Sequence, residues 1–507
     1  MMKTNQWIAI SFRATIRPFI LSLALYQVGC STSLPESFFD EQHLPNIYPN
    51  YASITIPPNI APLNFRVEEP GDAFRVRIAP DIGTPLILRG PDIDVPLQRW
   101  RKLLAENRGK ELRIDVFVRE KSQWRKFQTI VNHVAEEPID SYVAYRVLEP
   151  GFELYREITL RQRNLETFEE RCYYNNLRML GEGGQCANCH AFQNYRTQNM
   201  LFHTRAYCDG TVFIRNNVPR KVDLSFKDQA ISAATYPAWH PTLNLVVFSV
   251  NKTSQHFHTV SADRVEVLDI GSDLLFDDMD RNERAFIRLT VNEFETYPAW
   301  SLDGNWLYYC NAVVDFPNRD LDERRETALR HSKEIRYNLM RIPFDQNLRR
   351  FGNPQQLVDA ASQKKNITFP RPSPDGRYVM YCLSDAGCFS IWHRETDLWI
   401  LDLQTMETQP LTDANSSETE SFHCWSSNGR WFVFSSRRDD GLYTRLYFSY
   451  FDKQGRASKP FLLPQRRPEQ NRELMKSYNV PEFTIEPICV GIHAMTRVVQ
   501  SEEKNSR

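Results

Sequence analysis

The chain has 507 residues, with 62 Lys and Arg against 63 Asp and Glu, which gives a formal net charge of −1. Hydrophobic residues at 41% and charged residues at 25% are ordinary globular values, and they exclude a collagen-like, disordered or polytopic membrane protein. The balanced charge leaves no electrostatic footprint for nucleic acid, so no nucleic-acid partner is expected. The 30 prolines and 12% aromatic residues favour many short strands and turns over a helical bundle.

The first 29 residues predict an export signal. Basic residues precede an apolar stretch from Phe19 to Val28, which is too short to span a membrane as a mature helix. The stretch ends at Gly29-Cys30, which resembles the lipobox of bacterial lipoproteins. The resemblance implies an acylated Cys30, a polar tether over residues 30–50, and an outer-membrane lipoprotein of the cell envelope that faces the periplasm rather than the cell surface. A plain cleaved signal and a single anchor helix are the alternatives.

One motif carries chemistry. Residues 186–190 read Cys-Ala-Asn-Cys-His, the C-x-x-C-H pattern of c-type haem attachment. Two thiols three positions apart can add to the two vinyl groups of one porphyrin, and the following histidine can ligate the iron. The sequence therefore predicts one covalent haem c on Cys186 and Cys189, with His190 as a ligand of the iron. A zinc site or a motif with no bound group are the alternatives.

A sixth ligand of the iron would have to come from elsewhere in the chain. His203 is the first candidate and Met200 the second, because both follow His190 closely enough for a short loop to bring them across the porphyrin. An open, five-coordinate iron is the third. His256 and His258 lie in a polar stretch and are interpreted as surface residues.

A phrase of nine residues recurs four times from about residue 235. Each copy starts with an aromatic residue and precedes an alternating apolar strand. The copies are Tyr236–Asn244, Tyr297–Asn305, Phe369–Arg377 and Phe422–Arg430. The last three contain Asp-Gly or Asn-Gly, which predicts a tight hairpin turn with positive φ. Three to four antiparallel strands per roughly 40–60 residues are typical of a propeller blade.

These phrases resemble the PD40 (WD40-like) repeats of the TolB-type propellers, and Phe369–Tyr378 is the closest match. A further unit at Phe202–Asn216 and a final strand at Phe483–His493 that would close the ring bring the expected number of blades to five or six. The resemblance favours six. The predicted fold class is therefore mainly β, with a TolB-like β-propeller over residues 195–495.

The rest of the chain completes the expected domain plan. Strand-like runs broken by one helical stretch predict a small, β-rich, sandwich-like domain over residues 51–150. A helix from about Phe152 to Leu177 is expected to lead into the haem motif, so that residues 151–194 form a helical haem-attachment segment. Residues 496–507 read as a polar tail.

The order of these parts resembles a group of Bacteroidetes envelope proteins described as TolB-like or as cytochrome c biogenesis proteins. The phrases Pro138-Ile-Asp140, Glu149-Pro-Gly151 and Cys-x-Asn188-Cys189-His190-Ala-Phe192 carry this resemblance. It implies an envelope-anchored monohaem protein whose propeller binds an envelope or redox partner, for electron transfer or a haem-linked interaction. The alternative is a non-redox interaction scaffold in which haem or a metal is structural. No G-x-S-x-G nucleophile elbow is present, so no hydrolase activity is expected.

Overall fold

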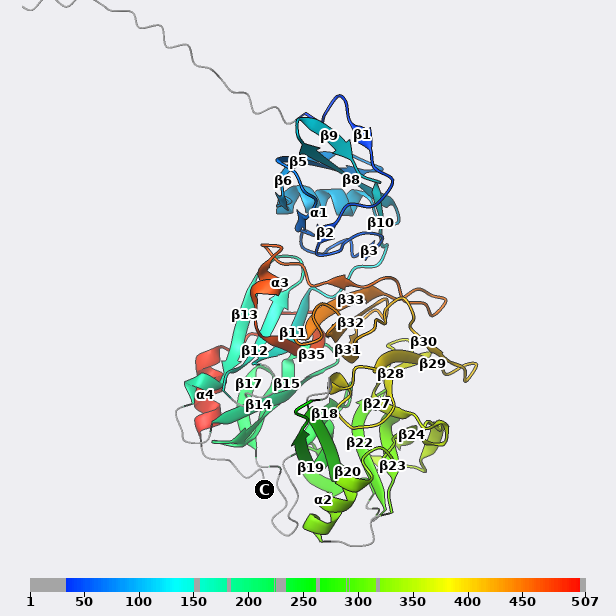
Figure 1. Ribbon diagram of the computed structural model, residues 1–507. Coiled ribbons are helices and arrows are strands. Elements are labelled where there is room, and N and C mark those ends of the chain that lie inside the picture. Colours follow the sequence, from blue (N-terminus) through cyan, green and yellow to red (C-terminus); the bar gives the residue numbers. More distant parts are fainter. Residues whose placement is uncertain are drawn as a thin grey trace, which may run out of the picture.

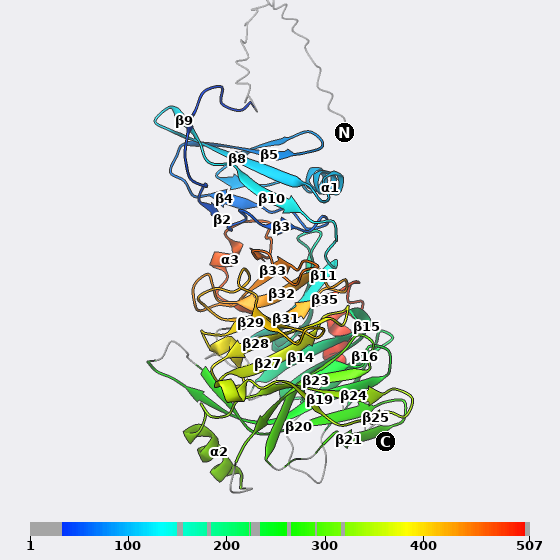
Figure 2. The ribbon, with the colours of Figure 1, turned by 90° about the vertical axis from the view of Figure 1, so that its right-hand side faces the viewer.

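The structure, a computed structural model, describes residues 33–149, 156–179, 184–222, 224, 234–260, 265–288, 290, 292–315 and 320–501. Cys30 and the predicted export signal lie outside the described residues. Within them, no helix is long and apolar enough to cross a membrane. The chain is mainly β, as predicted, and a small N-terminal domain stands on one side of a larger set of sheets (Figures 1 and 2).

The N-terminal domain has two sheets and one helix. The larger sheet has the order β1 (Phe39–Asp40), β9 (Gln123–Lys126), β8 (Glu111–Glu120), β10 (Ile130–Val134), β3 (Thr55–Ile56), with β5 (Ala73–Pro80) on β8 and β6 (Leu86–Gly90) on β5. The smaller sheet is β2 (Ile47–Tyr48), β4 (Phe65–Val67), β7 (Asp92–Ile93). Helix α1 (Leu97–Glu106) buries Trp100, Leu103 and Leu104, which share one face at i, i+3 and i+4.

Six antiparallel sheets make up the rest of the described residues. The first sheet contains β11 (Tyr142–Leu148), β12 (Ile158–Asn164), β13 (Glu170–Asn175) and, from the C-terminal end, β35 (Ser477–Thr484), and the second contains β14 (Gln185–Gln193), β15 (Arg196–Ala206), β16 (Gly210–Arg215) and β17 (Val218–Val222). The third contains β18 (Thr235–Trp239), β19 (Leu245–Phe257), β20 (Val265–Asp278) and β21 (Glu283–Phe286), and the fourth contains β22 (Glu293–Trp300), β23 (Trp306–Val313) and β24 (Asn338–Asp345) with β25 (Arg350–Phe351) and β26 (Gln355–Val358). The fifth contains β27 (Asn366–Pro372), β28 (Tyr378–Ser384), β29 (Asp397–Asp402) and β30 (Thr408–Pro410), and the sixth contains β31 (Glu420–Trp425), β32 (Trp431–Ser436), β33 (Arg445–Tyr450) and β34 (Phe461–Leu462). Three short helices accompany them: α2 (Leu321–Arg330), α3 (Gln470–Glu473) and α4 (Ile492–Gln500).

The sheets form a closed ring. One strand of each sheet contacts the corresponding strand of the next, in the order β14, β18, β22, β27, β31 and β35, and β35 contacts β14 again. These six are called the innermost strands below. β35 comes from the C-terminal end of the chain but pairs with β11, which lies more than 300 residues earlier. The two ends of the chain therefore close the ring, which is the arrangement of a β-propeller.

Three sequence-based expectations about the borders of the ring are wrong. The predicted helix from Phe152 to Leu177 is the strand pair β12 and β13, because Ile158–Asn164 is needed as the partner of β11. The Cys-x-x-Cys-His motif lies in strand β14 and not in the helical segment that was expected. β11 belongs to the ring, so the border at residue 150 is one strand too late.

Two further expectations fail at the ends of the chain. The predicted tether of residues 30–50 contains β1 and β2, which pair with β9 and β4 and belong to the N-terminal domain. The predicted polar tail contains most of α4, which buries Met495 and Val499 in a core shared with β13 and β16. Apolar residues at helical spacing explain this packing, because they give α4 one face that must be covered.

The repeat phrase builds the turns of the ring as predicted. Gly304, Gly376 and Gly429 have φ values of 72°, 72° and 67°, so only glycine adopts these positions without strain. A serine precedes each turn, and its hydroxyl both donates to the turn Asp or Asn and accepts the backbone N–H five residues later, as Ser373 does from Tyr378 N at 2.9 Å.

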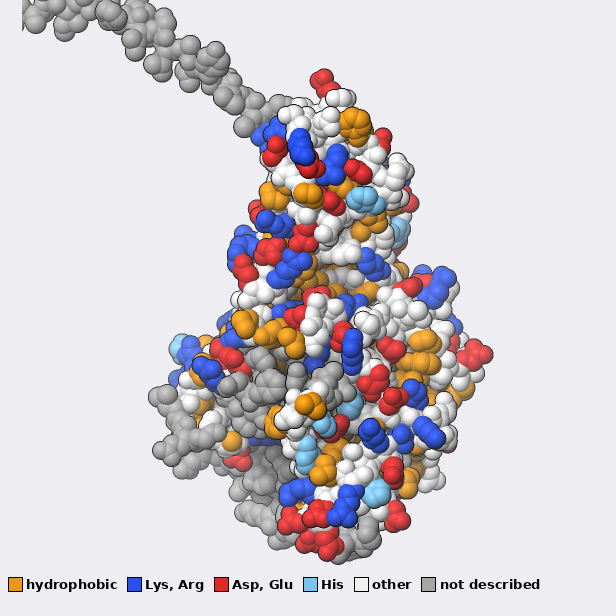
Figure 3. Space-filling model, viewed as in Figure 1, with side chains coloured by type: hydrophobic (Ala, Val, Ile, Leu, Met, Phe, Trp, Pro, Cys, Tyr) orange, Lys and Arg blue, Asp and Glu red, His pale blue; other side chains and the backbone are white. Residues whose placement is uncertain are grey.

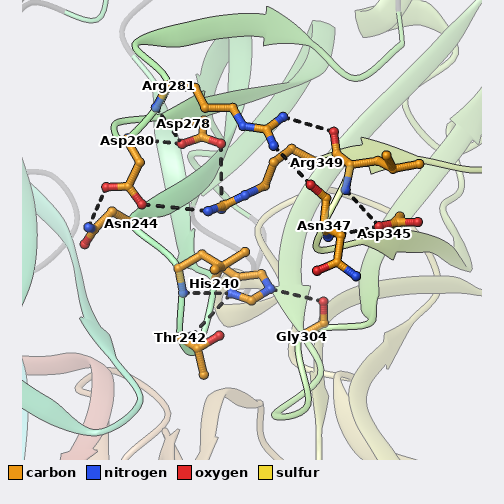
Figure 4. Close-up of polar contacts among 12 residues, drawn as sticks. His240, Thr242, Asn244, Asp278, Asp280, Arg281, Gly304, Asp345, Asn347 and Arg349 are labelled. Carbon is orange, nitrogen blue, oxygen red and sulfur yellow. Dashed lines mark hydrogen bonds and ion pairs between the residues drawn. The ribbon is translucent and has the colours of Figure 1, made fainter.

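The divergent copy, which lacks the glycine turn, is stabilised by a histidine instead. His240 Nδ1 accepts from the backbone N–H of Leu243 at 3.1 Å, and its Nε2 lies 3.1 Å from the carbonyl oxygen of Gly304 in the next sheet (Figure 4). Burial lowers the pKa of His240 to about 4, so its imidazole is neutral and can accept a hydrogen bond. Beside His240, the Nη1 atom of Arg349 lies 3.7 Å from the Oδ2 atom of Asp278, across the same interface between two sheets.

We expect Gly376→Val to lower the free energy of unfolding by roughly 1–3 kcal/mol, because a β-branched residue at this positive φ is strained. No atom lies within 4 Å of the position that a Cβ would take at Gly376, so the cost isolates backbone conformation. Gly271→Val is the matched control, since Gly271 lies inside β20 and a Cβ there meets only Arg324 Nη2 at 3.9 Å. Denaturant unfolding measures both variants. Equal stability of the two would contradict the assigned turn.

Candidate functional site: the thiol pair and histidine at the axis of the ring

The Cys-x-x-Cys-His motif lies on innermost strand β14. Cys189-His-Ala-Phe192 aligns with Tyr297-Pro-Ala-Trp300, so Cys189 takes the position that begins the repeat phrase elsewhere. Every innermost strand holds its residue at this position at positive φ: Cys189 (52°), Tyr236 (43°), Tyr297 (57°), Phe369 (53°), Phe422 (51°) and Val480 (51°). The predicted haem motif is therefore itself a copy of the repeat, inside the ring and not before it.

Each innermost strand bulges at this position. The pairing register shifts between Asn188 and Ala191 in β14 and between Thr296 and Ala299 in β22. The pairing register of the other innermost strands, including that of β35 with β11, shifts at the equivalent places. A bulged residue in left-handed conformation leaves the ladder and re-aims its side chain. One side chain per sheet is thereby freed from the alternation of the strand.

Four of the six bulge residues are aromatic and pack against one another at the axis. The ring centroids are 4.6 Å apart for Tyr236 and Tyr297, 4.2 Å for Tyr297 and Phe369, and 4.9 Å for Phe369 and Phe422. This set of four rings is called the aromatic plug below. The two remaining bulge residues, Cys189 and Val480, have smaller side chains and lie on neighbouring strands. They leave space beside the plug.

Two cavities meet at Cys189. The outer cavity, of about 200 Å³, is lined by Cys186, Asn188 and Cys189 among other residues. The inner cavity, of about 50 Å³, lies beside the aromatic plug and is lined by Cys189 and His190. The two thiols of the motif therefore share the outer cavity, while the histidine faces the inner one.

Both cysteines are free thiols and largely buried, Cys186 at 6% and Cys189 at 8% exposure. Burial raises the pKa of the Cys186 thiol, because a thiolate would lose its hydration, and the nearby guanidinium groups of Arg146 and Arg205 only partly oppose this. Cys186 is therefore a protonated thiol at neutral pH in the folded chain.

His190 is a buried imidazole, 2% exposed. Neither of its nitrogens forms a hydrogen bond of normal geometry with a described residue, and the backbone of Val480 is the nearest polar group that acts on it. Burial and the charge of Arg146 lower the pKa of His190 to about 3, although the backbone of Val480 lies close enough to oppose them. The imidazole of His190 is neutral and keeps an unused lone pair, which is an uncommon state for a buried polar group.

The structure does not bring the predicted sixth ligands to this site. His203 lies on β15 and is buried against Phe248, with its Nδ1 2.7 Å from the hydroxyl of Thr211. Met200 is fully buried in the core shared with α4. Neither residue lines the outer or the inner cavity. His256 lies on β19 with its Nε2 3.0 Å from the Ser254 hydroxyl, which agrees with its interpretation as a residue outside the site.

Sequence reasoning missed several polar residues of the two cavities. Arg146 lines both cavities, and Arg371, His423 and Glu482 line the inner one. Burial raises the pKa of Glu482 to about 7, against the charge of Arg371, and its carboxylate accepts from the backbone N–H of Phe192 at 3.3 Å. His423 has the same place in the repeat phrase as His190, so alignment of the phrases could have found it.

The donors present fit a covalent haem. Two thiols on one strand face one cavity, and a neutral, unpartnered imidazole follows the second thiol directly. The outer cavity is smaller than the roughly 300–1,000 Å³ of usual cofactor sites, so a porphyrin attached there would extend out of it. Among the described residues, no group of three or more His, Cys, Asp and Glu side chains is placed to hold a metal ion.

Comparison with known proteins gives only distant likenesses. No family model and no curated protein matches the chain. A chain of a nidogen/laminin complex matches 67% of this chain and 97% of its own length at 10% identity, with a TM-score of 0.36. A Synechocystis apocarotenoid oxygenase matches 85% and 95% at 11% identity, with a TM-score of 0.37, and tricorn protease matches 70% and 34% at 12% identity, with a TM-score of 0.33. These TM-scores are below 0.5, too low to establish a shared fold.

Proposed function

We propose that the chain is an envelope lipoprotein that carries one covalent haem c at the axis of a six-bladed, TolB-like β-propeller. The observation that carries the proposal is the placement of two free thiols and an unpartnered, buried imidazole on one innermost strand, at the gap in the aromatic plug. Six sheets in a closed ring, with the repeat phrase at equivalent places, support the proposed number of blades.

In this proposal each motif residue has one role. Cys186 and Cys189 hold the haem through thioether bonds, and His190 is the protein ligand of the iron. When bound, the haem supplies one-electron redox chemistry. The bulge of β14 positions Cys189, and the aromatic plug keeps water away from the inner side of the site.

The propeller would dock an envelope protein or a redox partner. On the face seen in Figure 3, basic and acidic side chains are interspersed, and no continuous basic stripe runs across the described part of that face. With the net charge of −1, this mixed surface favours a protein partner over nucleic acid. Hydrolase chemistry has no support in the residues of the site.

A second candidate is a non-redox interaction scaffold whose thiols stay free. The volume of the outer cavity, about 200 Å³, is the observation that favours it, because the cavity does not enclose a porphyrin. In this case the motif would be a structural copy of the repeat, and the propeller face alone would act.

We expect protein matured in a cell with a c-type haem attachment system to show a pyridine haemochrome spectrum and a haem-bearing mass after denaturation. The variant Cys186→Ala, Cys189→Ala should lose the haem entirely, because both thioether bonds are removed. His190→Ala should lose it or retain it without the spectrum of six-coordinate iron.

A control separates the haem from general damage to the fold. Cys489→Ala removes an exposed thiol and should keep the haem. Free thiols at both Cys186 and Cys189 in the fully matured protein would reject the haem proposal and favour the scaffold.

The envelope anchor is tested through Cys30. We expect Cys30→Ala to release the protein from the membrane fraction into the periplasm, because acylation supplies about 0.8 kcal/mol of binding per buried CH₂ group. Ser33→Ala, three residues further on, is the control and should stay with the membrane. Cys30→Ala protein that remains in the washed membrane fraction would point to an uncleaved anchor or a tightly bound partner.

A further inference from the structure

The outer cavity presents two arginine side chains to its interior. Arg146 comes from β11 and Arg205 from β15, and both line the cavity beside the two cysteines. Arg146 also lines the inner cavity, so it stands where the two meet. The positive charge of the site thus comes from two different sheets that the closure of the ring brings together.

Neither guanidinium group has a partner among the described residues. Arg146 is 9% exposed, and no hydrogen bond or ion pair joins it to a described residue. The Nε atom of Arg205 is buried and equally without a partner. A buried guanidinium is costly unless an anion or hydrogen-bond acceptors compensate it. The Nε atoms of both arginines are buried without a partner, and Arg205 as a whole is partly exposed, so both guanidinium groups are free to bind an anion in the cavity.

The remaining lining leaves that charge uncompensated. Glu149 is the one acidic residue among the described residues that line the outer cavity, and its carboxylate lies 3.9 Å from the Lys476 ammonium. Asn188 and Asn479 line the same cavity and add amide groups to it. Asn188 accepts from the backbone N–H of Cys189 at 2.8 Å.

We infer that Arg146 and Arg205 form a carboxylate-binding site in the outer cavity. A planar guanidinium matches a carboxylate through two parallel N–H···O bonds, which favours this class of anion. The carboxylate can come from two sources: the propionate groups of a haem held by Cys186 and Cys189, or a free small carboxylic acid. The first source rests on the proposed function and the second does not.

The first arm of the test uses protein made without haem attachment and titrates succinate by isothermal calorimetry. We expect saturable binding that Arg146→Gln and Arg205→Gln each weaken about tenfold, which corresponds to 1.4 kcal/mol. Arg99→Gln is the control, because Arg99 is an exposed residue of α1 in the N-terminal domain, and it should leave the affinity unchanged. Arg205→Lys, which keeps the charge but not the fork, should recover part of the binding.

The second arm uses the haem-loaded protein and measures its reduction potential and succinate binding. If the propionates fill the site, succinate no longer binds, and Arg146→Gln and Arg205→Gln shift the potential while Arg99→Gln does not. If succinate still binds, the natural ligand is a free carboxylate.

The arms also separate this inference from the proposed function. A chain that never acquires haem but binds succinate through the two arginines removes the haem and keeps the carboxylate site. Succinate binding absent from the haem-free protein, with a haem potential indifferent to both arginine variants, overturns the carboxylate site. Thermal melts of each variant confirm that it is folded. Arg146 is the more buried of the two arginines, so if Arg146→Gln does not fold, the result for Arg205→Gln alone decides the test.

Discussion

The left-handed bulge in each innermost strand is the constraint on which the rest of the molecule depends. A regular strand would alternate its side chains between the two neighbouring sheets and would leave none at the axis. The bulge costs backbone strain, since five of the six residues that adopt it are large or β-branched. The contacts among Tyr236, Tyr297, Phe369 and Phe422 offset this strain by filling the axis.

The site exists because two neighbouring bulges lack an aromatic residue. Cys189 and Val480 belong to β14 and β35, the strands that meet where the first and last parts of the chain close the ring. The space beside the plug therefore lies at the closure. Arg146 reaches it from β11, the strand that β35 pairs with, so the site is complete only in the closed ring.

The closure is supported by the N-terminal domain. The backbone N–H and hydroxyl of Ser427, in the turn before β32, both donate to Asp140, at 2.7 and 2.5 Å. Trp431, fully buried at the start of β32, donates its indole N–H to the carbonyl of Glu137 at 3.0 Å. The phrase Pro138-Ile-Asp140 thus has a structural role between the domain and the ring.

The turns could be predicted, because the phrase from Phe369 to Arg377 contains Asp-Gly, and the glycine of that pair needs positive φ. The sequence showed the aromatic residue that begins each phrase, but it did not predict that these residues pack against one another at the axis. The copy of the phrase at Cys189 was not recognised in the sequence, because cysteine replaces the aromatic residue and Asn194-Tyr195 replaces Asp-Gly. Asn194 and Tyr195 both have positive φ in the structure. A closing strand was expected at Phe483–His493, but the strand that closes the ring is β35, Ser477–Thr484. Its pairing with β11 could not be predicted, since long-range register leaves no local pattern. Arg146 was missed for the same reason.

Anomalous diffraction at the iron edge, from crystals of the fully matured protein, tests the central claim most directly. The account predicts one iron in the ring beside β14, with electron density continuous from the Sγ atoms of Cys186 and Cys189. A crystal that contains no iron, with both thiols free beside the aromatic plug, would contradict it, as would an iron bound away from β14.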